Sequence, residues 1–462
     1  MKLIKKIAAM LFAFAMVFSM TGVVQADETT DGSITINNAI EGQTYTIYKI
    51  LDLESYDGNN YSYKAESGWD AFITGAGKSY LKTIENGYVE FVGTEADMPA
   101  FAKSALKFAK DNGLAKVASK TADATNTVTF GTLSLGYYLI DSSTGALCSL
   151  DTTRPTATVQ EKNSVPTVDK TILVSNNATK KNSANIGDKV LFKTTIDAKK
   201  GAENYVLHDK MDAGLTFDSI HSVQGNQPSP VYGTDCILQT KNLGDDCTFH
   251  LVFTQEYLNN LTDSHEIDVV YGATVNENAK INQANTNQTW LTYGDNKKSN
   301  VDETQTFSFG IPVFKYTGLT KTGLADAQFK LYNDKACKDE VKLTKADDHT
   351  YRVDPKGNAT MVSPIDGKFN VNGLKAGTYY LKEMTAPKGY NKLANPIIVT
   401  IDNDGKISAD DKTTTEVGVE NKSGTLLPST GGMGTTLIYL AGIVLVVLSG
   451  YVLISKRRAS TK

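Results

Sequence analysis

Thiols and imidazoles are the first side chains to consider, because they form disulfides, bind metals and act as nucleophiles. The chain has four cysteines and five histidines among 462 residues. Cys236 and Cys247 flank a short hairpin-like segment and could form a disulfide outside the cell, although a pair of free buried thiols fits almost as well. The histidines are scattered without metal-ligand spacing, and no Ser/His/Asp or Cys/His set stands out. The sequence therefore predicts no metal site, no cofactor and no enzyme active site.

Two short motifs suggest a bound ligand but are incomplete. Gly75-Ala76-Gly77-Lys78-Ser79 has the end of a phosphate-binding loop, but Phe72 occupies the position of that loop's first glycine. Asp402-Asn403-Asp404-Gly405 begins like a calcium loop, but Thr413 stands where the bidentate glutamate belongs. A hairpin turn is the better interpretation of the second motif.

Both ends of the chain carry targeting signals. Basic residues near the N-terminus precede an apolar run from Ile7 to Met20, and Val24-Gln25-Ala26 has small residues where a signal peptidase cleaves. We expect residues 1–26 to be a cleaved signal peptide. Near the other end, residues 435–454 form an apolar stretch long enough to span a membrane, followed by Lys456-Arg457-Arg458, which places the preceding chain outside the cell. An ordinary single-span membrane protein is the alternative.

The pentapeptide Leu427-Pro428-Ser429-Thr430-Gly431 stands just before this apolar stretch. With the stretch and the basic tail, it resembles the cell-wall sorting signal of Gram-positive surface proteins. The resemblance implies that a sortase cysteine attacks the carbonyl of Thr430, expels Gly431 and forms an acyl-enzyme. An amine then resolves this intermediate: one from peptidoglycan anchors the protein in the wall, and a lysine of another copy extends a polymer.

The residues between the two signals have the composition of all-β domains, rich in Thr, Val, Tyr and Asn. Alternating patterns such as Ser33–Ile36 and Lys189–Thr194 predict strands, and Asp97-Met98-Pro99 predicts the start of a helix. The net charge of −4 and the lack of a basic stripe argue against nucleic acid as a partner. We expect tandem immunoglobulin-like β-sandwich domains, with a small helical insertion in the first: residues 27–163, 164–311 and 312–424, followed by the sorting signal at 425–462.

The third block contains the run Tyr380-Leu381-Lys382-Glu383-Met384-Thr385-Ala386-Pro387-Lys388-Gly389-Tyr390. This run resembles the acidic-motif strand of the collagen-adhesin B-type (prealbumin-like) domains of pilins and adhesins. The resemblance implies that Lys315 condenses with Asn421 while Glu383 assists. Burial would lower the pKa of the amine and raise that of the carboxyl, giving a neutral nucleophile and an acid that moves protons. A partly buried ion pair is the alternative.

The second block resembles the A-type domain of the same proteins through Pro166–Lys170 and Val206–Met211. The resemblance implies Lys170 as nucleophile and Asp209 as acid, unless Asp209 only caps a turn. Asn287 is the first choice for the acceptor and Asn296 the second. The first block resembles pilin N-terminal domains, and no acid motif predicts a third bond there.

The full order of segments resembles the shaft pilin of sortase-assembled pili. Lys162, in Val159-Gln160-Glu161-Lys162-Asn163, stands where that family carries its acceptor lysine, although the Tyr and Pro of the family motif are missing. A solvated linker lysine is the alternative. The resemblance implies a structural subunit rather than an enzyme, covalently attached at the cell surface, with sortase, other copies of the chain, minor pilins, peptidoglycan and host surface ligands as partners. A solitary wall-anchored adhesin and a wall-linked enzyme are the other classes considered.

Overall fold

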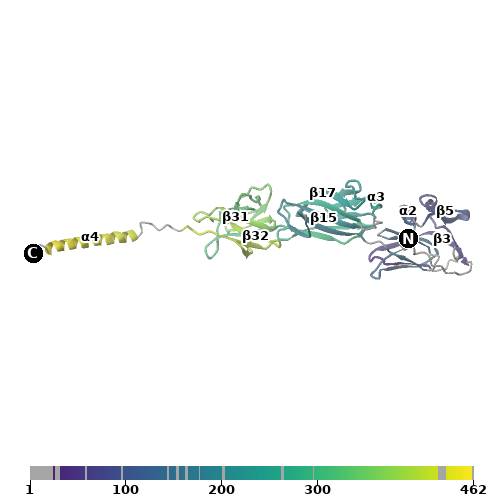
Figure 1. Ribbon diagram of the computed structural model, residues 1–462, viewed down its shortest axis with the longest axis horizontal. Coiled ribbons are helices and arrows are strands. Elements are labelled where there is room, and N and C mark those ends of the chain that lie inside the picture. Colours follow the sequence, from purple (N-terminus) through teal and green to yellow (C-terminus); the bar gives the residue numbers. More distant parts are fainter. Residues whose placement is uncertain are drawn as a thin grey trace, which may run out of the picture. The chain divides into compact units, whose positions relative to one another are not determined.

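The computed structural model describes residues 24–25, 32–57, 60–94, 97–142, 145–151, 156–161, 165–175, 177–199, 203–261, 265–294, 296–424 and 433–459. The chain folds as two compact units, residues 1–308 and 309–462 (Figure 1). The second unit begins at Phe309, in the strand that contains Ile311, after which the sequence analysis placed its boundary. The fold is mostly β, as predicted, with tandem sandwich domains and little helix.

The N-terminal part of the first unit contains two sheets. A large sheet has the order β10-β9-β3-β4-β6-β5, with β1 and β7 also paired to β3, and a small sheet has the order β11-β2-β8. Ile34 and Ile36 are fully buried and alternate with partly buried neighbours on β2, and this places one face of the small sheet in the core. The strands are β1 (Val24–Gln25), β2 (Gly32–Asn37), β3 (Thr44–Asp57), β4 (Asn60–Ala65), β5 (Leu81–Thr83), β6 (Tyr88–Phe91), β7 (Ala118–Thr121), β8 (Thr127–Leu133), β9 (Gly136–Ser142), β10 (Gly145–Asp151) and β11 (Thr156–Gln160).

The predicted helix of this part is α2 (Met98–Asp111), which packs against β9 and β10 of the large sheet. The short helix α1 (Asp70–Thr74) contacts β5, and the 3-10 turn η1 (Glu85–Gly87) lies between β5 and β6. Pro99 lies in the first turn of α2, where the backbone N–H groups have no acceptor within the helix. The N–H that proline lacks therefore costs the helix no hydrogen bond. Phe101 and Ala105 are buried, and Phe108 packs on Trp69 with ring centroids 5.9 Å apart. The helical insertion expected in the first domain is therefore present.

The rest of the first unit is a sandwich of two sheets. One sheet has the order β13-β12-β15-β20-β17, and Figure 1 labels two of its strands, β15 and β17. The other has the order β14-β23-β21-β16-β19-β18, with β22 paired to β21. The elements are β12 (Thr167–Val174), β13 (Asn177–Thr179), β14 (Lys181–Ser183), β15 (Lys189–Ala198), β16 (Val206–Met211), β17 (Leu215–Gly225), β18 (Cys236–Gln239), β19 (Phe249–Phe253), α3 (Gln255–Leu258), β20 (His265–Val275), β21 (Ala284–Tyr293), β22 (Lys297–Lys298) and β23 (Asp302–Phe307).

The second unit opens with a smaller sandwich. Its sheets have the orders β25-β24-β30-β28-β27, with β35 paired to β24, and β29-β26-β31-β32-β33-β34. The first and last strands, β24 and β35, therefore lie side by side and run parallel. The strands are β24 (Phe309–Thr317), β25 (Thr322–Gly323), β26 (Gln328–Tyr332), β27 (Leu343–Lys345), β28 (Thr350–Val353), β29 (Met361–Val362), β30 (Lys368–Leu374), β31 (Gly377–Thr385), β32 (Ile397–Ile401), β33 (Ile407–Ala409), β34 (Lys412–Thr414) and β35 (Val417–Glu420).

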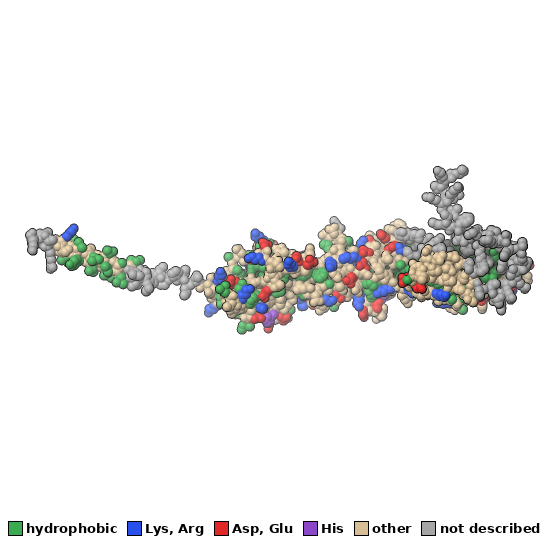
Figure 2. All heavy atoms as spheres, turned by 90° about the horizontal axis from the view of Figure 1, so that it is seen from below, with side chains coloured by type: hydrophobic (Ala, Val, Ile, Leu, Met, Phe, Trp, Pro, Cys, Tyr) green, Lys and Arg blue, Asp and Glu red, His purple; other side chains and the backbone are tan. Residues whose placement is uncertain are grey.

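The last element is the helix α4 (Met433–Ala459). Its segment Ile438–Lys456 has a mean hydropathy of 2.3 and exposes its side chains, and Figure 2 shows them as hydrophobic along the helix. This is the length and composition of a membrane span, close to the predicted residues 435–454. The sorting pentapeptide Leu427–Gly431, the lysine Lys162 and most of the predicted signal peptide lie outside the described residues.

Candidate functional site

Lys315, Glu383 and Asn421 lie together in the interior of the second unit, with exposed fractions of 0%, 2% and 1%. Lys315 is on β24 and pairs with Val419 of the parallel strand β35. Asn421 follows that strand directly. Glu383 comes from β31 in the opposite sheet, where alternate side chains face the core. The sandwich thus places an amine, a carboxyl and a carboxamide from three strands at one buried point.

Glu383 lies between the other two side chains. Its Oε1 is 3.7 Å from Nζ of Lys315, and its Oε2 accepts a hydrogen bond of 3.0 Å from Nδ2 of Asn421. The backbone N–H of Leu393 donates to the same Oε2 at 2.8 Å and fixes the carboxyl. Nζ of Lys315 also donates to the carbonyl of Val419 at 3.0 Å. One carboxyl oxygen therefore faces the amine and the other faces the amide nitrogen.

Burial lowers the pKa of Lys315 from 10.5 to about 8, and the nearby Glu383 opposes this shift only in part. Each pKa unit changes the neutral fraction roughly tenfold, so the share of uncharged amine near neutral pH rises by about two orders of magnitude. An uncharged amine has the free electron pair that a nucleophile needs.

Lys170, Asp209 and Asn287 form a second buried group in the sandwich of the first unit, and all three side chains are fully buried. Lys170 is on β12, in one sheet, and the other two residues are on β16 and β21, in the facing sheet. Asn287 pairs with Met211, so it lies diagonally across from Asp209 on the same face. The structure thus brings together the lysine, the acid and the first-choice asparagine.

The contacts in this second group centre on the carboxyl of Asp209. Its Oδ2 is 2.6 Å from Nζ of Lys170, and the hydroxyl of Tyr271 hydrogen-bonds to both residues. Burial lowers the pKa of Lys170 and raises that of Asp209, and each group partly opposes the shift of the other. Transfer of a proton from Lys170 to Asp209 would leave a neutral amine beside a protonated carboxyl. This is the combination that condensation requires.

The side-chain amides of the two acceptor asparagines, Asn287 and Asn421, make few hydrogen bonds for groups that are so deeply buried. Within the described part of the chain, the side chain of Asn287 makes no hydrogen bond of ordinary geometry, although it lies close enough to Asp209 and Tyr271 to oppose in part the rise that burial causes in the pKa of both. Oδ1 of Asn421 also has no hydrogen-bond partner there. An unpaired buried polar group costs roughly 1–3 kcal/mol. Such groups in a folded protein need a functional reason, and reaction with the neighbouring amine would supply one.

One expected residue lies away from the buried group, and one residue of the group was not expected. Asn296, the second choice for the acceptor, is exposed in the turn after β21 with a φ of 62°, so it does not reach the buried group. Tyr271, which the sequence reasoning missed, is part of it. Tyr271 stands on β20 among inward-facing Ile267, Val269 and Ala273. The inward-facing row of β20 otherwise holds aliphatic residues after His265 at its start, so a tyrosine in its middle is the signal that could have identified it.

Cys236 and Cys247 are free thiols, so the disulfide considered above is wrong for this structure. The two residues do flank a hairpin, but its register pairs Cys236 with Phe253 and Gln239 with His250. Cys247 therefore lies beyond the opposite end of the hairpin. At about 3.3 Å per residue, the two cysteines are much farther apart than the ~7 Å between Cα atoms that a disulfide allows.

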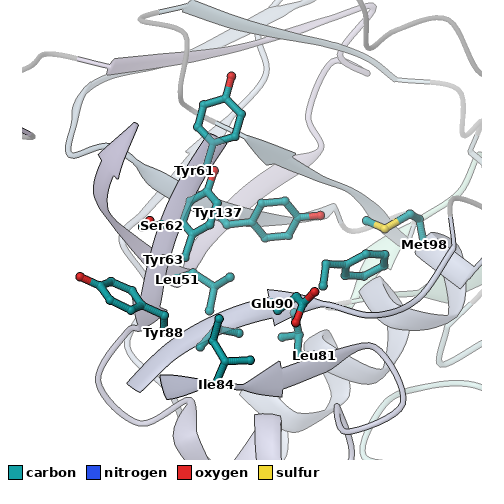
Figure 3. Close-up of a pocket in the computed structure, with 12 residues that line it drawn as sticks. Leu51, Tyr61, Ser62, Tyr63, Leu81, Ile84, Tyr88, Glu90, Met98 and Tyr137 are labelled. Carbon is teal, nitrogen blue, oxygen red and sulfur yellow. The ribbon is translucent and has the colours of Figure 1, made fainter. Parts of the chain in front are cut away.

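A hollow of about 580 Å³ lies in the N-terminal part of the first unit (Figure 3). Strands β3 to β6, β9 and the start of α2 line it. Tyr61, Tyr63, Tyr88 and Tyr137 contribute four phenol rings, and Leu51, Leu81 and Ile84 contribute aliphatic surface. Exposed tyrosines combine an apolar face with a hydroxyl, which suits binding of amphipathic ligands.

Comparison with known proteins identifies a family for the second unit. Residues 311–415 match the family of SpaA prealbumin-like fold domains. The fimbrial subunit type 1 of Actinomyces viscosus is 31% identical over 170 residues, covering 30% of this chain and 31% of that protein. The chain therefore matches about a third of the length of this relative.

Three solved structures share the fold over most of the chain. The backbone pilin of serotype M6 Streptococcus pyogenes aligns with a TM-score of 0.54 and 16% identity, covering 86% of this chain and 94% of that one. The major pilins SpaD and SpaA of Corynebacterium diphtheriae each align with a TM-score of 0.51, at 16% and 18% identity. They cover 87% and 85% of this chain, and the whole of each solved chain.

Proposed function

We propose that this chain, which has the fold of the Gram-positive major pilins, is the shaft subunit of a covalently polymerised pilus on the cell surface. The observation that carries the proposal is the pair of buried groups of amine, acid and carboxamide, one in each compact unit. Each group links the first strand of its sandwich to a strand or segment near the end of the same sandwich. Covalent bonds at these positions would carry a pulling force that hydrogen-bonded strands alone would resist poorly.

Bond formation in the second unit follows from the contacts of Glu383. The neutral Nζ of Lys315 attacks the side-chain carbonyl carbon of Asn421, and the proton lost by the amine passes to Oε1 of Glu383. The carboxyl gives a proton from its other oxygen to Nδ2, which Oε2 already contacts. The bond from the carbonyl carbon to Nδ2 breaks, ammonia leaves, and an amide joins the two side chains. Asp209 has the same role between Lys170 and Asn287.

Each internal bond would close a loop of about a hundred residues. By analogy with the entropy model for disulfides, closing such a loop contributes about 5 kcal/mol to stability. This is a large share of the 5–15 kcal/mol that typically stabilises a whole domain. Subunits of a thread-like fibre exposed outside the cell would gain resistance to unfolding.

Assembly uses the C-terminal end of the mature chain and a lysine between its first two domains. A sortase cleaves after Thr430 and transfers its carbonyl to the amine of Lys162 in the next subunit, and the final subunit is transferred to peptidoglycan. The apolar helix α4 supports this, because it would hold the sorting motif at the membrane until cleavage. Minor pilins and host surface ligands are the remaining expected partners.

Immunoblots of cell-wall extracts test polymerisation. Wild-type cells should show a ladder of high-mass species that survives boiling in detergent. The Lys162→Ala variant should lose the ladder, whereas Lys116→Ala, which changes an exposed lysine of the same unit, should keep it. A single monomer-sized band from wild-type cells would contradict the shaft function.

Intact-mass spectrometry tests the internal bonds separately. Recombinant residues 27–424 should have the calculated mass minus two ammonia molecules, and Glu383→Ala should regain one of them. The full calculated mass in the unchanged chain would contradict both bonds.

The second candidate function is a wall-anchored adhesin that does not polymerise, and the tyrosine-lined hollow of Figure 3 favours it. Tyrosine faces stack against sugar rings and proline-rich peptides, so either ligand from host matrix or glycan would fit the hollow chemically. The same immunoblot separates the two candidates, since an adhesin of this kind gives no ladder.

A further inference from the structure

The outer face of the seven-stranded sheet carries a cluster of four metal-ligating side chains, His208, Asp245, Cys247 and His250. His208 on β16 lies directly opposite His250 on β19 in the antiparallel register. Asp245 and Cys247 come from the segment that leads into β19. Since Leu207 and Asp209 face the interior, His208 faces away from the buried Lys170 group.

One ligating atom from each of the four residues lies within 4.8 Å of the others. Nδ1 of His208 is 3.2 Å from Oδ2 of Asp245 and 3.6 Å from Sγ of Cys247. Nε2 of His250 is 3.0 Å from the same Oδ2 of Asp245. The four donors therefore converge on one point from two strands and one turn.

Three of the six donor–donor separations match the edges of a tetrahedron around zinc, and all six are within 4.8 Å. With zinc–nitrogen bonds of 2.0–2.1 Å and zinc–sulfur bonds of 2.3 Å, tetrahedral geometry gives about 3.3 Å between nitrogen or oxygen donors and about 3.6 Å between nitrogen and sulfur. The contacts of His208 and His250 given above agree with both values within a few tenths of an ångström.

The imidazole ring of His208 is oriented by a hydrogen bond from its second nitrogen, as is common for histidines that bind a metal. Its second nitrogen, Nε2, lies 2.9 Å from the hydroxyl of Thr292, which directs Nδ1 toward the cluster. The indole of Trp290 stacks on the same ring, with centroids 5.2 Å apart and planes 9° from parallel. The orientation of this ligand is therefore fixed before any metal binds.

We propose that His208, Asp245, Cys247 and His250 form a structural Zn²⁺ site. Two imidazoles, a thiolate and a carboxylate suit zinc, whereas calcium and magnesium prefer oxygen donors only. Four protein ligands leave no open position for a substrate, so the site is structural rather than catalytic. Burial and the adjacent carboxylate of Asp245 raise the pKa of Cys247 to about 12, so metal binding must release the thiol proton to solvent. The ion would fasten the segment before β19 to β16.

The histidine spacing in the sequence predicted no metal site, and this inference reverses that expectation. The two imidazoles come together only because β16 and β19 pair in a register that places them opposite each other. The inference is independent of the proposed pilus function.

The test uses residues 27–430, the chain expected after both cleavages, kept reduced and stripped of metal. Competition titration against a chromophoric chelator should show one tightly bound Zn²⁺ per chain. Cys247→Ser and His250→Asn should each weaken binding by at least about 100-fold, and Thr292→Val by roughly 10–100-fold. The matched controls Cys337→Ser and His349→Asn, in the second unit, should bind as wild type does.

Cobalt gives an independent readout in the unchanged chain. Co²⁺ should produce the intense sulfur-to-cobalt absorption of a tetrahedral thiolate site, and Cys247→Ser should abolish it. Absence of this band in the wild-type chain would overturn the proposal even if a variant failed to fold. Equal zinc affinity of Cys247→Ser, His250→Asn and wild type would also overturn it.

Discussion

Replacing Asn421 with alanine should make the stability of the second unit depend on pH in a way that the wild type does not. The substitution removes the acceptor carboxamide and leaves Lys315 as a free amine beside Glu383. Burial lowers the pKa of unreacted Lys315 to about 8 in the folded chain, against 10.5 in the unfolded chain, and we expect the folded variant to keep this shift. If the proposed bond forms, wild-type Lys315 is joined in an amide and does not titrate.

The size and sign of the effect follow from these two pKa values. Between pH 8 and 10.5 the unfolded variant binds more protons than the folded variant, so the stability of the folded variant rises with pH. A shift of about 2.5 units at 1.36 kcal/mol per unit corresponds to about 3 kcal/mol. The penalty is fully present below pH 8 and absent above 10.5. Loss of loop closure adds a pH-independent cost of about 5 kcal/mol.

Urea unfolding of residues 309–424 between pH 7 and 11 measures both contributions. The stability difference between wild type and Asn421→Ala should narrow by about 3 kcal/mol across this range. A double variant, Lys315→Met with Asn421→Ala, has no amine to titrate and should follow the wild-type pH dependence. Parallel curves for wild type and Asn421→Ala would refute the reasoning, because an unreacted wild-type lysine would titrate in the same way.

Three further predictions concern the buried groups and their support. Asp209→Ala should retain one ammonia by intact mass, and retention of none would exclude Asp209 as the acid. Tyr271→Phe removes a hydroxyl that contacts both Lys170 and Asp209. Because the lost contact is worth about one hydrogen bond, formation of the internal bond after refolding should slow about tenfold in time-resolved mass spectrometry. An unchanged rate would mean that Tyr271 only fills space in the core. Gly367→Ala should lower the unfolding free energy of the second unit by at least about 2 kcal/mol in urea unfolding. The reason is that φ of Gly367 is +74° and a Cβ there would lie 2.0 Å from the carbonyl oxygen of Lys315. A loss below about 0.5 kcal/mol would contradict this close approach of the two backbones.

Much of the fold followed from local pattern. Alternating residues such as Lys189–Thr194 became β15, and the helix expected after Asp97 became α2 with its apolar face on the large sheet. These elements were predictable because the periodicity of burial is written into consecutive residues.

The buried groups were only partly predictable. Motif resemblance indicated Lys315, Glu383 and Asn421, and the structure places them within contact of one another. For Lys170 the sequence left two asparagines open, and it did not identify Tyr271. The choice between Asn287 and Asn296 depends on which side of β21 faces the core and where that strand ends, and neither is fixed by residue type.

By itself, the sequence determined the β-rich class and predicted the targeting signals and the lysines and acids that could react, because these depend on composition and on neighbouring residues. Only the tertiary structure decided which side chains meet. It joined His208 to His250 and separated Cys236 from Cys247, since contact across a sheet depends on strand register. Register is set by the packing of the whole sandwich, and a one-residue shift would turn every side chain to the other face.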